Sequence, residues 1–451
     1  MEAKLEVAER EIIKPSSSAP HDRLQLSLID VFFPKVYVSA IFFYQTVAGG
    51  ESPAIISGKL KSSLSETLSR FYPLAGRIEG FSINCNDEGA VFTEARTDLL
   101  LSDFLKNNLD DTNNLGEFFP KIEPGESAGT WPLLSVKVCF FGSGSGVAVT
   151  VATSHQICDA ASLLTFIQSW ATVNGESNDM VMTTPHFTGA TIYPPPPNSF
   201  QANSMDDISG RKGKCVTNRF VFKSSKIADL KRKAASESVP VPTRVEAITS
   251  LIWICATNAS RSNSSVAAKS TLMSQAMDLR LRIPSNILSR DAIGNLQTGF
   301  FLKEGAESEM EIGNMVAKFR KAKEGVNEMI EDNLQEYKTA GAITNTTFGQ
   351  NLLISVMGNY LSEVKPDVDL YAMTSWCKKP FYKVEFGWGT PVWVGSASHT
   401  VYDNTVYAVL MDSKDGEDVE AWVGLPEQDM LMFVRDQDLL TYAVLNPPVL
   451  I

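Results

Sequence analysis

A chain of 451 residues is longer than one ordinary hydrophobic core requires, so two domains of roughly 200 residues each are expected. Its content of 44% hydrophobic and 20% charged residues is typical of a soluble globular protein. The formal net charge of -12 argues against nucleic acid and anionic membranes as partners, and an anionic ligand would need a local basic pocket.

The sequence also indicates where the protein is found. The first fifteen residues are charged and have no apolar core of a signal peptide, and no later stretch approaches the ~18 apolar residues of a membrane span. The cysteines are scattered without a CxxC pair, at Cys85, Cys139, Cys158, Cys215, Cys255 and Cys377. This pattern predicts reduced thiols in a cytoplasmic protein, with neither disulfides nor a zinc site.

The first clear element is a helix within residues 59–77. Apolar side chains recur there at helical spacing, at Leu60, Leu64, Leu68 and Phe71. Pro73 is expected to end this helix, because proline lacks the backbone N–H that the helix needs.

A hairpin is predicted next, from strands at 133–141 and 147–154 joined by the turn "GSGSG". It leads directly to His155. After Asp159 the period changes to that of an amphipathic helix, with apolar residues at Leu163, Phe166, Ile167 and Trp170. His155 is therefore expected at the junction between a strand and a helix.

Residues 174–217 are irregular, and "YPPPPNS" and "SGRKGK" within them fit neither a helix nor a central strand. We expect an N-terminal domain over 1–185, a crossover loop over 186–217 and a C-terminal domain over 218–451.

Strands and helices alternate again in the second domain. Strands are predicted at 216–222, 381–391, 407–412 and 419–425, and helices at 224–235 and 310–332. Thr243 and Glu246 form a capping box ahead of a further apolar helix. Because no GxGxxG motif or P-loop is present, the mixture favours a layered α/β (α+β) fold over a Rossmann fold.

Several roles for His155 are open from the residues alone. A lone histidine at the end of a strand is often structural. His155 and Asp159 have metal-ligand types, but no further His or Cys pair completes a site. Cys158 could act as a nucleophile with His155 as its base, although no oxyanion-hole motif is visible. A neutral imidazole could also act as a general base in acyl transfer without a covalent intermediate.

The motif "HQICD" at 155–159 fits HxxxD, and "FGWG" follows at 386–389. Further blocks stand in the same order along nearly the whole chain: "IIKPSSSAP", "FYPLAGRI", "QAMDLRLR", "AIGNLQ", "TSWCKKPFY" and "VEAW". With these blocks the chain resembles the plant BAHD acyl-CoA-dependent acyltransferases. "IIKPSSSAP" and "NCNDEGA" resemble most the vinorine synthase-like branch of alkaloid acyltransferases.

The resemblance implies two chloramphenicol-acetyltransferase-like domains, with the active site in a channel at their interface. A segment near 355–380 would pack with the N-terminal domain. Acyl-CoA would be a co-substrate without any bound cofactor, and the protein would be a monomer that acts on a small-molecule alcohol. Its function would be acyl transfer, with acetyl-CoA as the expected donor and an alkaloid hydroxyl as the acceptor.

The resemblance also assigns roles to residues. His155 would be the general base, and Asp159 would pair with Arg280 as a structural brace. Thr374 and Trp376 would lie near the acyl group and its oxyanion. The motif Phe386, Gly387, Trp388 and Gly389 would be structural, shaping the side on which CoA binds.

Two features relate to the CoA side. Glu385 stands where the family has aspartate, so its carboxylate is displaced by about 1.5 Å, one carbon–carbon bond. Cations that could meet the CoA phosphates are Lys226, Lys231, Arg232, Lys233, Lys378 and Lys379. Their alternative role is that of solvated surface charges.

Three functions follow for comparison. The first is O-acylation of a plant specialised metabolite. The second is N-acylation of an amine by the same machinery. The third is a non-catalytic relative in which Glu385 marks a degenerate CoA site.

Overall fold

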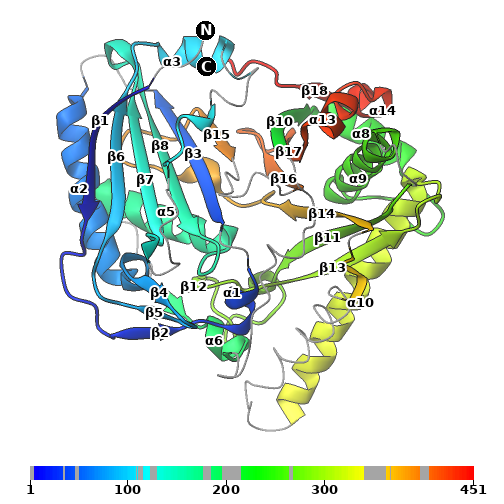
Figure 1. Cartoon of the computed structure of the whole chain (residues 1–451), viewed down its shortest axis with the longest axis horizontal. Coiled ribbons are helices and arrows are strands. Elements are labelled where there is room, and N and C mark those ends of the chain that lie inside the picture. The colour runs from blue at the N-terminus through cyan, green and yellow to red at the C-terminus, as the bar shows by residue number, and fades with distance from the viewer. Residues whose placement is uncertain are drawn as a thin grey trace.

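Two large β-sheets with helices packed against them dominate the described part of the chain, which also has one two-stranded and one three-stranded sheet (Figure 1). The computed structural model describes residues 5–33, 36–45, 50–107, 109, 115–121, 130–175, 184–195, 215–263, 268–339, 362–365, 367–396 and 406–451. The layered α/β architecture expected from the sequence is confirmed. Among the described residues, no helix has the length and apolar character that crossing a membrane requires.

The first sheet has six strands in the described residues. Their order is β1 (Glu6–Ile13), β6 (Ala90–Arg96), β7 (Leu134–Phe140), β8 (Gly146–Ser154), β3 (Tyr37–Gln45) and β15 (Trp393–Ser396). β7 and β8 form the predicted antiparallel hairpin, with Val136 opposite Val151. The short 3-10 helix η3 (Gly142–Gly144) makes the turn between them.

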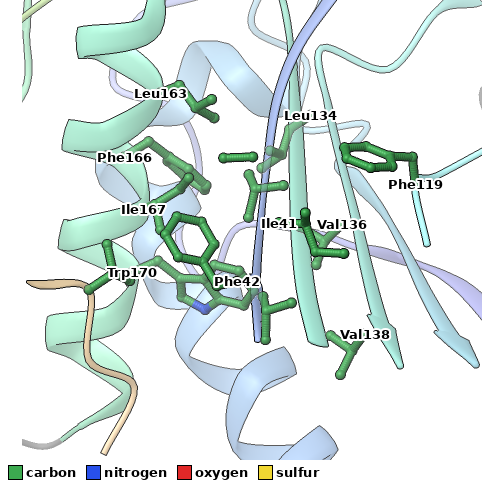
Figure 2. Close-up of a cluster of buried hydrophobic side chains, with 14 of the residues drawn as sticks. Ile41, Phe42, Phe119, Leu134, Val136, Val138, Leu163, Phe166, Ile167 and Trp170 are labelled. Carbon is green, nitrogen blue, oxygen red and sulfur yellow. The ribbon is translucent and has the colours of Figure 1, made fainter. Parts of the chain in front are cut away.

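Helices α2 (Pro53–Arg70) and α5 (Ala160–Asn174) accompany this sheet. The predicted end of α2 is confirmed, since the helix stops at Arg70 and the 3-10 helix η1 (Tyr72–Ala75) contains Pro73. The apolar stripe of α5 faces the strands (Figure 2). Phe166, Ile167 and Trp170 are fully buried there beside Phe42 of β3. Burial of this stripe holds α5, and thus the strand–helix junction before it, in place.

The second sheet has seven strands in the described part of the chain. Their order is β13 (Gln297–Glu304), β11 (Ser270–Asp278), β14 (Val368–Ser375), β16 (Tyr407–Asp412), β17 (Val419–Pro426), β10 (Cys215–Phe222) and β18 (Ala443–Leu445). Its helices are α8 (Ser224–Lys233), α9 (Arg244–Asn263), α10 (Ile312–Thr339), α13 (Glu427–Phe433) and α14 (Gln437–Tyr442).

The predicted capping box before α9 is confirmed in both directions. The backbone N–H of Thr243 donates to Glu246 at 2.8 Å, and the N–H of Glu246 donates to the Thr243 hydroxyl at 3.2 Å. Glu246 also receives hydrogen bonds from Arg320 and Lys323 of α10. One residue therefore caps α9 and joins it to its neighbouring helix.

Short elements lie around and between the sheets. They are α1 (Leu28–Phe32), α3 (Leu101–Asn107), α6 (Gly189–Ile192), β2 (Arg23–Gln25), β4 (Arg77–Glu79), β5 (Ser82–Asn84), β9 (His186–Phe187), β12 (Ala292–Ile293), η4 (Leu279–Leu281) and η6 (Phe381–Lys383). Much of the expected crossover, 186–217, lies outside the described residues.

The prediction of a strand over 381–391 is wrong. The segment begins with η6 and continues as a loop, in which Gly387 and Gly389 have φ of 96° and 89°. These left-handed conformations are incompatible with an extended strand. The strand forms just beyond the loop, as β15.

β15 is the point at which the C-terminal half of the chain joins the first sheet. It pairs antiparallel with β3, with Val394 opposite Phe42, and Phe381 and Phe386 before it are buried in the core of that sheet. Within the expected return segment, 355–380, β14 belongs to the second sheet; residues 355–361 lie outside the described residues. The domain boundaries themselves stay a prediction.

Candidate active site

His155 follows the last residue of β8 and precedes α5. Its backbone N–H donates to the Val36 carbonyl at 2.8 Å, which continues the pairing of β8 with β3 by one residue. The residue as a whole is half-buried. The Phe33 ring stacks on the imidazole with 4.2 Å between centroids and 16° between planes.

Asn295 holds the other side of the imidazole. Its Oδ1 lies 3.1 Å from Nδ1 of His155, and its Nδ2 donates to the His155 carbonyl at 2.6 Å and to Asp30 Oδ1 at 2.8 Å. Both partners of Nδ2 are acceptors, so the amide oxygen must be the atom that faces the ring. We therefore assign the proton of the neutral imidazole to Nδ1, which leaves the lone pair on Nε2.

Asp159 is the N-cap of α5. Its Oδ1 accepts the backbone N–H of Ser162 at 2.8 Å, as Asp at this position commonly does. The structure brings it together with Arg280, which donates to both carboxylate oxygens, at 2.8 and 3.2 Å. Asp159 is 5% exposed and Arg280 2%. The pair joins the end of β8 in the first sheet to the segment after β11 in the second.

The Asp159–Arg280 pair also positions the segment that carries Asn295. Arg280 donates to the carbonyls of Ala292 and Gly294, at 2.8 and 3.2 Å, and Asp159 accepts the N–H of Leu296 at 3.1 Å. The backbone between these anchors turns at Gly294, where φ is 140°. Asp159 therefore contacts the segment that carries Asn295, and Asn295 contacts the imidazole.

Burial sets the charge state of the imidazole. It lowers the pKa of His155 below its ordinary value of 6.5, and the opposing effects of Asp159 and Asn295 are smaller. His155 is therefore neutral near pH 7 and able to accept a proton. For Asp159, burial alone would raise the pKa, but Arg280 and the hydrogen bonds bring it below 3.8, so the carboxylate is ionised.

The role of Cys158 as a nucleophile loses support. Cys158 is 0% exposed, and burial raises the pKa of its thiol well above the ordinary range, so it is a poor nucleophile. Among the described residues, no cluster of three or more His, Cys, Asp or Glu side chains could hold a metal ion.

Thr374 and Trp376 lie at the end of β14. Thr374 is half-buried and faces Val409 of β16 in the sheet register. The backbone N–H of Trp376 donates to the Leu410 carbonyl, and the Trp376 ring stacks on that of Phe381 with 5.2 Å between centroids. No hydrogen bond or ring contact connects either residue to His155 within the described part of the chain. Their oxyanion role stays a prediction.

The FGWG loop lies at the other end of α5 from His155. Phe386 is buried against Trp170 and Tyr44, and its carbonyl accepts from Asn174, the last residue of α5. Because α5 has 15 residues at about 1.5 Å rise each, the loop sits roughly 22 Å from the start of the helix. The motif thus braces the helix on which the candidate site depends.

Glu385 is exposed and makes no ion pair with any described residue. Its carboxylate raises the pKa of Tyr44, after the larger effect of burial. The ion pair that would let glutamate replace the usual aspartate is therefore not seen in the described ranges.

The candidate CoA cations are not brought to His155. Lys226, Lys231, Arg232 and Lys233 lie on α8, which packs against α9 and α14 beside the second sheet (Figure 1). Lys233 pairs with Asp438, and Arg232 with Asp229. Lys379 donates to Asp278, a partner of Arg280, and so belongs to the buried network instead. CoA binding by α8 stays a prediction.

Three residues of the site were not identified from the sequence, among them Phe33, which stacks on the imidazole. Asn295 lies within the block "AIGNLQ" and Asp30 follows "LSLI", but neither position has a pattern that marks chemistry. Only the fold brings them to His155.

Comparison with known proteins places these features in a family. The model of the Transferase family matches residues 3–440. The chain is 60% identical to BAHD acyltransferase BIA1 of Arabidopsis thaliana, over the full length of both. It is 32% identical to limonoid 1-O-acetyltransferase of Citrus sinensis, covering 97% of each chain.

Two further relatives extend this comparison. A 17,18-epoxy-17-hydroxycur-19-ene N-malonyltransferase of Strychnos nux-vomica is 31% identical, over 98% of this chain and 91% of that one. The crystal structure of vinorine synthase superimposes with a TM-score of 0.77 at 28% identity, covering 97% of this chain and 98% of that one. The two-sheet architecture is thus that of the matched family.

Proposed function

The chain belongs to the BAHD acyltransferases, which use acyl-CoA as co-substrate, and we propose that it transfers an acetyl group to a hydroxyl of a plant specialised metabolite such as an alkaloid. The observation that carries the proposal is the bond between Asn295 and His155, which leaves Nε2 of a neutral imidazole as the free base. Relatives that act as O-acetyltransferases support the choice of hydroxyl and acetyl.

The proposed reaction is a direct transfer in a ternary complex. Nε2 of His155 accepts the proton of the acceptor hydroxyl while the oxygen attacks the thioester carbonyl of acyl-CoA. The resulting tetrahedral oxyanion collapses, the carbon–sulfur bond breaks, and the CoA thiolate takes the proton from the imidazolium. Nδ1–H keeps its hydrogen bond to Asn295 throughout, so the ring need not turn between the two proton transfers.

The rest of the site supports this reaction by holding its geometry. Asp159 and Arg280 anchor the segment that carries Asn295, and we assign them a structural role. Thr374 and Trp376 are the proposed neighbours of the acyl group, and Lys226, Lys231 and Lys233 are proposed to meet the CoA phosphates. Because both sheets of one chain supply the site, we further propose that the protein is a monomer. We also propose a cytoplasmic location and domains at 1–185 and 218–451.

The test is acyl transfer by purified protein with acetyl-CoA and hydroxylated alkaloids, compared with His155→Ala. Removal of a general base is expected to lower kcat by about 10²–10⁴-fold. His21→Ala is the matched control, because His21 is an exposed histidine that follows Pro20 and lies outside the site. Full turnover by His155→Ala would rule out the assigned base.

N-acylation is the second candidate, and one relative named as an N-malonyltransferase favours it. Pairs of acceptors that differ only in hydroxyl or amine, each offered with acetyl-CoA and malonyl-CoA, separate the two functions. A non-catalytic role is tested by calorimetry with CoA. Absence of CoA binding would exclude either transferase activity.

A further inference from the structure

Helix α1 contacts the candidate site on two sides of His155. Phe33, which directly follows the helix, stacks on the imidazole face at 4.2 Å. Asp30, inside the helix, contacts Asn295, whose amide holds Nδ1. The stacked ring keeps the imidazole plane in place, so the orientation of the Asn295 amide decides which ring nitrogen carries the proton.

Asp30 is held so that one carboxylate oxygen is reserved for Asn295. Its Oδ2 accepts the N–H and the hydroxyl of Ser27, at 2.9 and 2.6 Å, in the capping box of α1. Its Oδ1 accepts the backbone N–H and Nδ2 of Asn295, at 3.2 and 2.8 Å. Asp30 is 4% exposed and Asn295 0%, so water does not substitute for these bonds.

We propose that Asp30 is a positioning residue that orients the Asn295 amide and so selects the Nδ1–H tautomer of His155. The proposal rests on the function proposed above, in which Nε2 of His155 is the base. The reason is one of hydrogen-bond polarity. Oδ1 of Asp30 only accepts from Asn295, and a reversed amide would place two oxygens against each other there.

The consequence of losing Asp30 follows from the same geometry. Without Asp30, Nδ2 of Asn295 keeps the His155 carbonyl as an acceptor but loses the carboxylate, so the amide is held by fewer bonds and turns more readily to present Nδ2 to Nδ1 of the ring. That arrangement favours the Nε2–H tautomer, which cannot take a proton from the acceptor. The histidine would still be present and buried, but its lone pair would point to the wrong side.

Nitrogen-15 NMR of histidine-labelled protein tests this directly, because the ring nitrogens of each tautomer have distinct shifts. The chain has only 4 histidines, and the His155 signals are assigned by their loss in His155→Ala. We expect Nδ1–H in the wild-type protein and a substantial fraction of Nε2–H in Asp30→Ala. An unchanged Nδ1–H tautomer in Asp30→Ala would overturn the proposal.

Two variants separate orientation from simple damage to α1. Ser27→Ala removes the other half of the capping box but leaves the Asp30–Asn295 bonds, so it should keep the Nδ1–H tautomer. Asp30→Asn retains a carbonyl oxygen for Asn295 and should also keep it. If Asp30→Ala does not fold, Asp30→Ser, whose hydroxyl is too short to reach Asn295, replaces it in the comparison. Nε2–H in Ser27→Ala or Asp30→Asn would count against an orienting role.

Kinetics provide the second measurement. Loss of a residue that orients a catalytic group through another is expected to lower kcat about 10–100-fold in Asp30→Ala. KM for acyl-CoA should change by less than about twofold, because Asp30 acts on the base and not on CoA. A raised KM with unchanged kcat would contradict the proposal. The NMR result needs no substrate, so it stands or fails separately from the assigned acyl transfer.

Discussion

Asp159 and Arg280 meet as a bidentate pair, with N–O distances of 2.8 and 3.2 Å, where the segment after the first sheet's β8 approaches the second sheet's η4. Neither residue is hydrogen-bonded to the His155 ring within the described residues. The carboxylate of the HxxxD motif therefore serves as an anchor between two parts of the fold. It fixes the backbone around Asn295, and Asn295 in turn contacts the base.

We expect Asp159→Ala to destabilise the protein by about 3–5 kcal/mol, because the buried Arg280 guanidinium loses its bidentate partner and keeps Asp278, at 3.2 Å, as its ion-pair partner among the described residues. Urea denaturation followed by tryptophan fluorescence measures this. Arg280→Ala should cost a similar amount, and the double variant should cost less than the sum of the two, since the pair is lost only once. Strict additivity of the two changes would show that the ion pair does not couple these residues.

The same pair shows what the sequence could predict. HxxxD, FGWG and the blocks between them indicate the family, and this resemblance implies an arginine partner for Asp159, which is predicted to be Arg280. Hydrophobic periodicity predicted α2, the β7–β8 hairpin and α5, because each buries a regular stripe or face.

Asn295 and Asp30 were missed for a physical reason. Asp30 lies 265 residues from Asn295 in the sequence, and their bond depends on the tertiary approach of α1 to the segment after η4. Single polar residues in such segments have no period or spacing to read. The prediction of a strand over 381–391 was wrong because it relied on alternating apolar residues. Two glycines in left-handed conformations prevent a strand there.

The pH dependence of acyl transfer should follow the neutral form of His155. Because burial lowers the pKa of this imidazole, kcat/KM is expected to rise with pH through a value below 6.5 and to be level by about pH 7. Phe33 stacks on the ring and Asn295 holds Nδ1, while the charge of Asp159 favours the protonated ring by a smaller effect than burial. Asp159 is ionised throughout this range, because its pKa lies below 3.8. A limb centred well above 6.5 would contradict a buried neutral base.

Phe33→Ala is expected to move that limb to higher pH. Removing the stacked ring exposes the imidazole, which favours its charged form and raises the pKa of His155. Phe33→Leu is the matched control, since leucine keeps much of the apolar cover and should shift the profile less. Identical profiles for all three proteins would mean that Phe33 does not contribute to the burial of the base.

Cys158 should be neither reactive toward thiol reagents nor needed for activity. The side chain is fully buried and burial raises the pKa of its thiol, so iodoacetamide should not modify Cys158 in the folded protein. Cys158→Ala should retain kcat within about threefold, since the proposed reaction forms no acyl-cysteine. Mass spectrometry of the labelled protein and steady-state rates measure these outcomes. An acetylated Cys158 peptide after turnover would require a covalent mechanism instead.

Substitutions at the neighbouring positions 385 and 386 should have very different effects on the stability of the protein. Phe386→Ala removes a ring buried against Trp170 and Tyr44, and about 3–5 kcal/mol of stability should be lost with it. Glu385 is exposed and has no ion-pair partner among the described residues, so Glu385→Asp should change stability by less than about 0.5 kcal/mol. Thermal denaturation of the two variants provides this comparison.

Kinetics then decide what the carboxylate does for CoA. Glu385 is exposed and lies far from the start of α5, so we expect that it does not contact CoA. In that case Glu385→Asp and Glu385→Ala should both keep the wild-type KM for acyl-CoA. A KM that falls in Glu385→Asp and rises in Glu385→Ala would instead show that the family's usual aspartate supports CoA binding and that glutamate does so less well. In either case Phe386→Ala should lower activity through the loss of folded protein, which a titration of active sites distinguishes from a change in KM.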